Sequence, residues 1–555
     1  MRFILCILIL VSLANCRNQQ EPEPQTMLVT GGPIITMSEA GVVEAMAIQN
    51  GRISAVGNRE ELQRIFPKAT LYNLNGSTVL PGIVDSHTHV REMGEDRLKA
   101  DLTGVMSVEE MVTRLKDFFG ESQPGTWLIG QGWDEGVWGS KGYPDRQLLD
   151  EAFPNNPVAL ESLHGFGGFY NGKALELAGI NAQTPNPQVG TLLRRPDGSP
   201  SGVMLTTAQA LVNEHIPPPN LEDVKASIMK GLETMARAGV TSVHEAGMGP
   251  LHVRAFQELA DNNRLPIRVY GMLNGNDEAL MNSWFERGIQ IDPNCFFTVR
   301  SIKVFYDGSL GSRTALLKEP YSDKPHEANM TERMASSAVR VLAEKAARHK
   351  FQMAVHAIGD EGNNRILNIY EDVLAQHPQF DHRWRIEHAQ VVLPDYYQRA
   401  AQLAVISSMQ PAHAVGDSKW AEDRLGPDRI LNAYAWRKIL DAGAPLILNS
   451  DLPGEPWEPV KTLYFAVTRQ NEEGQPVGGW YKEQSLDTAT ALKTMTHSGA
   501  FAAFQDGEIG SLSPGALADF IELDRNPLLI EKEQLKDLQV LKTWVGGRLI
   551  DVPSN

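Results

Sequence analysis

The protein has 555 residues and a mass of 61.2 kDa, and its 68 acidic and 51 basic residues give a formal net charge of −17. This charge opposes broad contact with nucleic acid or anionic lipid head groups, so a small-molecule partner is expected, with no nucleic acid. The 48 Gly and 33 Pro follow no period, which excludes collagen-like and low-complexity classes. The length allows three or four domains, or one large α/β barrel with a smaller domain. A homo-oligomer is compatible with these values.

The first 15 residues have the pattern of a lipoprotein signal peptide. Arg2 precedes an apolar run that is too short to span a bilayer of about 30 Å as a helix. The run ends in LANC (13–16), which resembles the bacterial lipobox, although Asn15 departs from the usual small residue. We therefore expect a lipid on Cys16 to anchor the chain to a membrane of the bacterial cell envelope, facing the periplasm or the exterior. Residues 16–26 would form a tether; an ordinary signal peptide or an uncleaved anchor is the alternative.

Both ends of the remaining chain have the pattern of short strands joined by tight turns. Asn50-Gly51 lies between two alternating apolar runs, which is a strong hairpin signal, and Gly546-Gly547 marks a similar turn. Neither end is long enough to build its own core. We therefore predict that residues 27–80 and 506–555 pair into one β-sandwich domain.

Between these ends, apolar β-branched runs alternate with helical stretches, as in a parallel sheet with crossover helices. There are eight such runs, at 82–89, 241–246, 266–273, 299–306, 351–357, 384–389, 403–410 and 445–450. Eight βα units predict an α/β fold with a TIM-type (β/α)8 barrel over residues 81–505. Two surplus strand-like segments, 126–135 and 157–166, crowd between the first and second runs. We therefore predict an inserted subdomain at about 92–225, lying over the barrel mouth.

Side chains that bind metals stand at the ends of several predicted strands. His87 and His89 end the first strand on one face, His356 the fifth, His388 the sixth and Asp451 the eighth. Barrel active sites lie at these ends, and polar groups in apolar strands are costly unless they are paired or metal-bound. The pattern predicts a site for divalent metal, with zinc as the default and iron, manganese or nickel as alternatives. Hydrogen-bonded core histidines are the other interpretation.

Lys303 lies inside the fourth predicted strand. A buried ammonium beside metal ions would be repelled, whereas burial lowers a lysine pKa and favours the neutral amine. That amine adds carbon dioxide to form a carbamate, whose two oxygens can bridge two metals. An unmodified Lys303 that binds a substrate anion is the alternative.

Several segments together resemble the metal-dependent amidohydrolase superfamily, and within it the amidohydrolase-3 (YtcJ-like) branch, whose relatives include N-substituted formamide deformylase. They are LPGIVDSHTHV (80–90), KVFYDGSLGSRTA (303–315), VHAIGD (355–360), IEHAQ (386–390), NSDLPGEPWEP (449–459) and GSLSPGALADFIELDRNP (510–527). The resemblance runs from about residue 27 to 552. It implies one or two metal ions and these roles: His87 and His89 on the first metal, carboxylated Lys303 as the bridge, His356 and His388 on the second metal, and Asp451 as ligand and acid/base.

Three further residues are candidates for substrate binding. His164 lies in a segment that resembles an insert motif of the branch, and it either reaches the substrate or makes a structural hydrogen bond. Asp307 and Arg313 either orient the substrate or hold their loop. The chain departs from the branch at 205–207, where relatives usually carry a Glu, and at His244, so the substrate range stays open.

The resemblance implies hydrolysis of a carbon–nitrogen bond other than a peptide bond. The expected substrate is a linear amide such as an N-substituted formamide or an N-acyl compound. Metal-activated hydroxide would attack the carbonyl, Asp451 would carry the proton to the leaving nitrogen, and His388 or His164 would donate to the oxyanion. The alternatives are esters, carbamates or cyclic amides at the same site, or a surface lipoprotein that binds a ligand without catalysis. Aromatic residues in the predicted insert either bind an apolar substituent or pack the insert; they are Trp133, Trp138, Phe166 and Tyr170.

Overall fold

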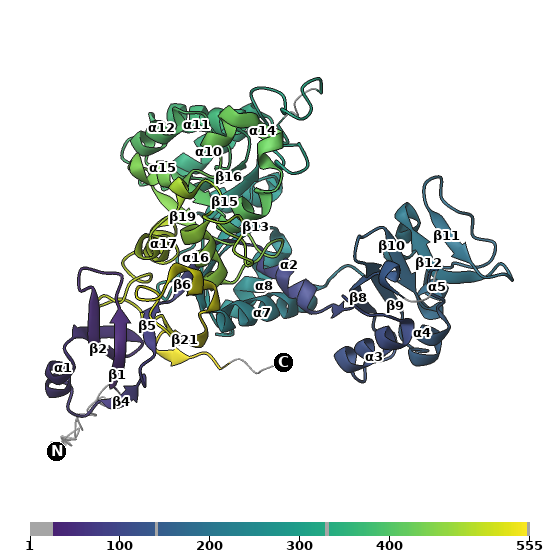
Figure 1. Ribbon diagram of the computed structural model, residues 1–555, viewed down its shortest axis with the longest axis horizontal. Coiled ribbons are helices and arrows are strands. Elements are labelled where there is room, and N and C mark those ends of the chain that lie inside the picture. Colours follow the sequence, from purple (N-terminus) through teal and green to yellow (C-terminus); the bar gives the residue numbers. More distant parts are fainter. Residues whose placement is uncertain (1–25, 139–141, 328–331, 552–555) are drawn as a thin grey trace, which may run out of the picture.

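A computed structural model describes residues 26–138, 142–327 and 332–551, and this part of the chain forms three sheets (Figure 1). The predictions of a signal peptide, a lipidated Cys16 and most of a tether fall on residues 1–25, which lie outside the described residues. They stay predictions. Within the described ranges, no helix is long and apolar enough to cross a membrane.

The two ends of the described chain form one mixed sheet of eight strands (lower left in Figure 1). Its elements are β1 Thr26–Ile35, β2 Val42–Gln49, β3 Arg52–Gly57, α1 Arg59–Ile65, β4 Thr70–Asn73, β5 Thr78–Pro81, β20 Phe520–Leu523, β21 Val540–Val545 and β22 Arg548–Leu549. Both residues of the Asn50-Gly51 and Gly546-Gly547 turns have positive φ, as tight hairpins require.

A bend in β1 shapes this sheet. The register shifts after Thr30, so the first half of β1 pairs with β4 and its end pairs with β5. The bend needs glycine, because a Cβ on Gly32 would lie 2.0 Å from the carbonyl oxygen of Ser77. The bent sheet encloses a small apolar core that includes Phe520 and Trp544 from the C-terminal end.

The middle of the described chain forms a barrel of eight parallel strands, each hydrogen-bonded to the next. They are β6 Ile83–Thr88, β13 Val240–Met248, β14 Arg268–Asn274, β15 Phe297–Phe305, β16 Gln352–Ala357, β17 Arg385–His388, β18 Ile406–Met409 and β19 Leu446–Leu448. The last strand returns to the first, where the backbone N–H of Asp451 donates to the carbonyl of His87 at 3.0 Å. The predicted barrel is confirmed, and each strand overlaps one of the eight predicted runs.

Helices surround these strands. They are α7 Leu221–Arg237, α8 Pro250–Asp261, α9 Glu278–Arg287, α10 Ser336–His349, α11 Asp360–Leu374, α12 Tyr396–Leu403, α13 Pro411–Asp417, α14 Ala421–Arg429, α15 Trp436–Asp441, α16 Pro459–Thr468, α17 Thr488–Thr494 and α18 His497–Ala502. In α7 the buried residues Val224, Ile228 and Leu232 are four apart and form one face, which is the helical period that the sequence shows.

A third sheet, of six strands, is inserted between β6 and β13 in the described chain. Its elements are β7 Ala100–Asp101, α3 Val108–Phe119, β8 Leu128–Trp133, α4 Gln147–Ala152, β9 Val158–Ser162, β10 Gly167–Tyr170, α5 Gly172–Leu177, β11 Thr191–Arg194, β12 Pro200–Leu205 and α6 Ala210–Asn213. Both surplus strand-like segments of the sequence belong to this sheet. It lies inside the range 92–225 in which the sequence predicts an insertion.

The insert stands apart from the barrel (right in Figure 1), so the expected lid over the barrel mouth is not formed within this chain. The two apolar cores of the insert consist only of residues between 100 and 216. The insert therefore buries its apolar side chains without packing them against the barrel. Trp133 and Phe169 are examples of residues buried in one of these cores.

The chain enters the insert along α2 Val90–Arg97 and returns along α7. These two helices pack closely because glycines lie at their contact. A Cβ on Gly94 would lie 1.7 Å from the carbonyl oxygen of Ser227, and one on Gly231 would lie 2.3 Å from that of Val90. The insert is therefore attached to the barrel through a tightly packed pair of helices.

Candidate metal centre

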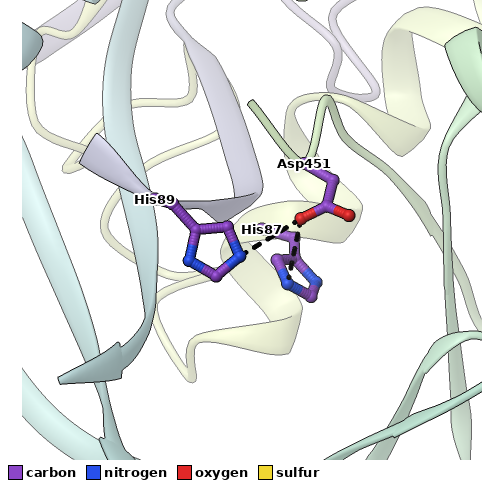
Figure 2. Close-up of side chains that lie close together, drawn as sticks. All are labelled: His87, His89 and Asp451. Atoms are coloured by element: carbon purple, nitrogen blue, oxygen red, sulfur yellow. Dashed lines mark ion pairs between the residues drawn. The ribbon is translucent and has the colours of Figure 1, made fainter. Parts of the chain in front are cut away.

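Three predicted ligands meet at the carboxyl ends of the barrel strands (Figure 2). His87 belongs to β6, His89 follows it directly, and Asp451 follows β19, the strand that closes the barrel against β6. Asp451 Oδ1 lies 3.4 Å from His87 Nε2 and 3.3 Å from His89 Nε2. The side chain of His87 is fully buried, whereas His89 and Asp451 are partly open to solvent.

This geometry fits a divalent metal. Ligands that lie 2.0–2.1 Å from a tetrahedral zinc ion are about 3.3 Å apart, and the measured N···O separations are 3.3 and 3.4 Å. Two imidazole nitrogens and a carboxylate oxygen are also the donors that zinc and similar ions prefer. Burial and the nearby Lys303 lower the pKa of His87 to about 4. The ring is therefore neutral at neutral pH, as a metal ligand must be.

A second group shares the same carboxylate. His388, His413 and Asp451 also offer ligand atoms that lie close together. Asp451 Oδ2 is 3.8 Å from His413 Nε2, and the ligand atoms of the three residues all lie within 4.8 Å of one another. Because Asp451 turns Oδ1 to one group and Oδ2 to the other, it stands between two candidate ion positions.

The sequence analysis missed His413. It lies in α13, which begins two residues after the seventh barrel strand, β18, ends. The signal was available, because a metal-binding side chain just beyond a predicted strand end satisfies the same rule that identified Asp451.

The backbone is strained at two of these residues. His388 has φ 76° and Asp451 has φ 53°, which is left-handed backbone that costs a non-glycine residue about 1–3 kcal/mol. Hydrogen bonds hold both turns. The Ser450 hydroxyl donates to Asp85 at 2.6 Å, and His388 Nδ1 lies 2.9 Å from Gln410 Oε1. The surrounding structure thus maintains a conformation that directs these two side chains into the site.

Glu245 supports His89 from the second barrel strand. Its carboxylate accepts hydrogen bonds from the Val90 N–H at 2.8 Å and the Thr88 hydroxyl at 3.2 Å. Glu245 therefore binds the residues on both sides of His89. Burial raises the pKa of Glu245 to about 7. The sequence analysis did not single out Glu245 or Asp85, although both are acidic residues in apolar strands.

Lys303 lies beside the first group and is fully buried. Its Nζ is 2.8 Å from His87 Nε2 and 4.5 Å from the centre of the Phe305 ring. Burial lowers the pKa of Lys303 to about 8, which makes the neutral amine accessible near neutral pH.

His356 comes close to the site but turns its nitrogen elsewhere. Its ring centre is 4.4 Å from that of His388, yet Nε2 lies 3.1 Å from the carbonyl oxygen of Gly308 and 3.5 Å from Asp307 Oδ1. Among the described residues, the two groups with converging ligand atoms do not include it. The structure thus places His413, rather than His356, opposite Asp451.

Asp307 and Arg313 hold the loop after β15. The Asp307 carboxylate accepts backbone N–H bonds from Leu316, Ile358 and Gly359, each at 2.9 Å. Arg313 forms an ion pair with Asp323 at 2.6 Å. Of the two roles left open by the sequence, these contacts support the one in which both residues hold their loop.

His164 is not brought to the metal centre of its own chain. It lies in the turn between β9 and β10 of the insert, its side chain is 69% exposed, and its Nε2 is 3.9 Å from Asp134. Of the four aromatic residues noted in the insert, Trp133, Trp138 and Tyr170 are buried while Phe166 is 70% exposed. Three of the four rings therefore pack the insert.

Comparisons with known proteins identify the family to which the chain belongs. The sequence model of the family described as "Amidohydrolase family" matches residues 70–551. The chain is 31% identical over 529 residues to the putative amidohydrolase YtcJ of Bacillus subtilis, covering 94% of this chain and 98% of that protein. It is 28% identical over 527 residues to the N-substituted formamide deformylase of Arthrobacter pascens, covering 91% of this chain and 94% of that enzyme.

A solved structure shows the same fold. The crystal structure of an uncharacterized metal-dependent hydrolase from Pyrococcus furiosus aligns with a TM-score of 0.74 at 28% sequence identity. The alignment covers 91% of this chain and all of that one. The likeness therefore extends over the sheet of the chain ends, the barrel and the insert together.

Proposed function

The chain belongs to the amidohydrolase family, and from this premise we propose that it hydrolyses a linear amide, such as an N-substituted formamide or an N-acyl amine. The observation that carries the proposal is the convergence of His87, His89 and Asp451 at the carboxyl end of the barrel. The full-length similarity to a formamide deformylase supports the amide class. We also propose zinc as the ion, on the basis of the donor set.

A divalent ion held by these residues would lower the pKa of a bound water towards about 7, and the ion would also polarise a carbonyl oxygen. Asp451 moves the proton. Burial alone would raise the pKa of its carboxyl, but His87 and the hydrogen bond with His89 hold this pKa well below its usual range. Asp451 is therefore ionised and accepts the proton of the attacking water. It then delivers the proton to the leaving nitrogen, which is expelled poorly without protonation.

The structure does not support either expected oxyanion donor. Burial and the neighbouring His356 keep the pKa of His388 well below its usual value, so the ring is neutral and has one N–H. Gln410 Oε1, 2.9 Å away, accepts that N–H from Nδ1. His164 lies between β9 and β10, and these two strands of the insert stand apart from the barrel in Figure 1. Neither histidine is therefore placed to donate to the oxyanion, and a bound ion would supply the polarisation of the carbonyl oxygen.

A matched substrate panel tests the proposed function. Zinc-loaded protein is offered N-benzylformamide, N-benzylacetamide, benzyl acetate and a cyclic amide of similar size, and release of amine or alcohol is followed. We expect the linear amides to be hydrolysed fastest. Cleavage of the ester while every amide is inert would contradict the amide assignment and favour the ester alternative. A folded, zinc-loaded protein inert toward all four would favour a ligand-binding role.

A further inference from the structure

A buried ion pair lies beneath the metal centre. Arg385 and Glu387 stand two residues apart on β17, so both point into the barrel, and both side chains are fully buried. The guanidinium binds the carboxylate through two donors, with Nη2 3.0 Å from Glu387 Oε2 and Nε in contact with Oε1. This two-point contact fixes the plane of the carboxylate.

The carboxylate contacts the metal ligand His87 on the opposite side. Glu387 Oε2 lies 2.5 Å from His87 Nδ1, while the other ring nitrogen, Nε2, faces Asp451 and Lys303. An ionised carboxylate can only accept, so Nδ1 carries the proton and Nε2 presents its lone pair to the site. The tautomer that a metal requires is therefore set by Glu387.

Arg385 is itself held by three other barrel strands. It donates to the carbonyl of Ser86 on β6 and to the hydroxyl of Ser408 on β18 at 3.2 Å, and its Nη1 is 3.0 Å from His244 Nδ1 on β13. A buried ion pair is rarely more stable than an apolar pair of the same volume. We therefore attribute the ion pair beneath His87 to its effect on the orientation of the His87 ring and not to a gain in the stability of the fold.

We propose that Glu387, held by Arg385, is a positioning residue that fixes the ring of His87 and thereby sets the affinity of the site for its ion. Carboxylates that accept the second N–H of a ligating histidine typically change metal affinity by about 10–100-fold when they are lost. This inference rests on the metal centre of the proposed function.

The test compares Glu387→Gln with a matched control, Glu522→Gln. Glu522 is also a buried carboxylate, but it accepts hydrogen bonds from Tyr72 and Trp544 in the sheet of the chain ends. Zinc affinity of the chelated proteins is measured by competition with a coloured chelator. We expect zinc to bind about 10–100-fold more weakly to Glu387→Gln and with unchanged affinity to Glu522→Gln. A folded Glu387→Gln with wild-type affinity would overturn the inference.

Two additions keep the test decisive. If Glu387→Gln does not fold, Glu387→Asp replaces it, because Asp keeps the charge facing Arg385 while withdrawing the carboxylate from His87; unchanged affinity there also overturns the inference. In the metal-free wild type, proton NMR is expected to show a low-field His87 Nδ1–H signal, and Glu387→Gln and Glu387→Asp are each expected to lose or shift it. A wild-type chain that takes up no zinc overturns the proposed function, and this inference with it.

Discussion

Asp451→Asn is expected to abolish hydrolysis while leaving the fold intact. Asn cannot accept the proton of the attacking water, and general acid–base groups contribute about 10²–10⁴-fold to rate. The change also removes the negative charge that faces four histidines, His87, His89, His388 and His413. Because both effects act together, we expect kcat on the amide substrate to fall by at least about 10³-fold.

A surface variant controls for nonspecific damage. Asp395 is an exposed residue of the barrel whose carboxylate lies 3.7 Å from Arg399, so Asp395→Asn should keep wild-type kcat. Circular dichroism and thermal unfolding check the fold of both variants. If Asp451→Asn retained turnover within a few-fold of wild type, Asp451 could not be the proton carrier.

Lys303→Ala is the second change with a large expected effect, and it distinguishes the two roles of this lysine. If a carbamate on Lys303 bridges two ions, its removal should lower kcat by at least about 100-fold, more than the loss of a residue that only orients a ligand. The substitution also leaves a buried space next to His87, where the Nζ had been. Added formate or acetate is then expected to restore part of the activity, because either anion supplies the missing carboxylate.

The same experiment identifies the alternative. If Lys303 instead binds a substrate anion as an ammonium, methylamine would rescue the variant and acetate would not. Lys345→Ala, a change at a partly exposed residue of α10 that lies away from the site, controls for effects of the added salts. Full activity of Lys303→Ala without any additive would contradict both roles.

Much of the fold follows from local pattern. The eight apolar runs become the barrel strands because each is short, β-branched and followed by a helix or loop, and parallel strands bury both faces. The position of the insert does not follow from such patterns. The segments at 126–135 and 157–166 predict extra strands. Whether their sheet covers the barrel depends on whether the insert buries its own apolar side chains and on how α2 packs against α7, and no local sequence pattern determines either.

The candidate site was predictable where a ligand ends a strand. His87, His89 and Asp451 satisfy that rule and meet in the structure. His356 satisfies it as well, yet its Nε2 turns toward Gly308, because the rule places a Cα and does not fix a side-chain rotamer. His413 lies in a helix that begins just beyond its strand, so the same rule indicates it, but its position opposite Asp451 follows only from the three-dimensional fold.

We propose that hydrolysis requires a metal ion bound at these histidines and Asp451. The most direct measurement is amide hydrolysis by one preparation before chelation, after chelation and after zinc is returned, with the metal content determined at each stage. We expect the metal-free protein to stay folded, to lose activity, and to regain it as one or two equivalents of zinc are bound. If the folded, metal-free protein hydrolyses the amide as fast as the zinc-loaded one, hydrolysis does not need the ion.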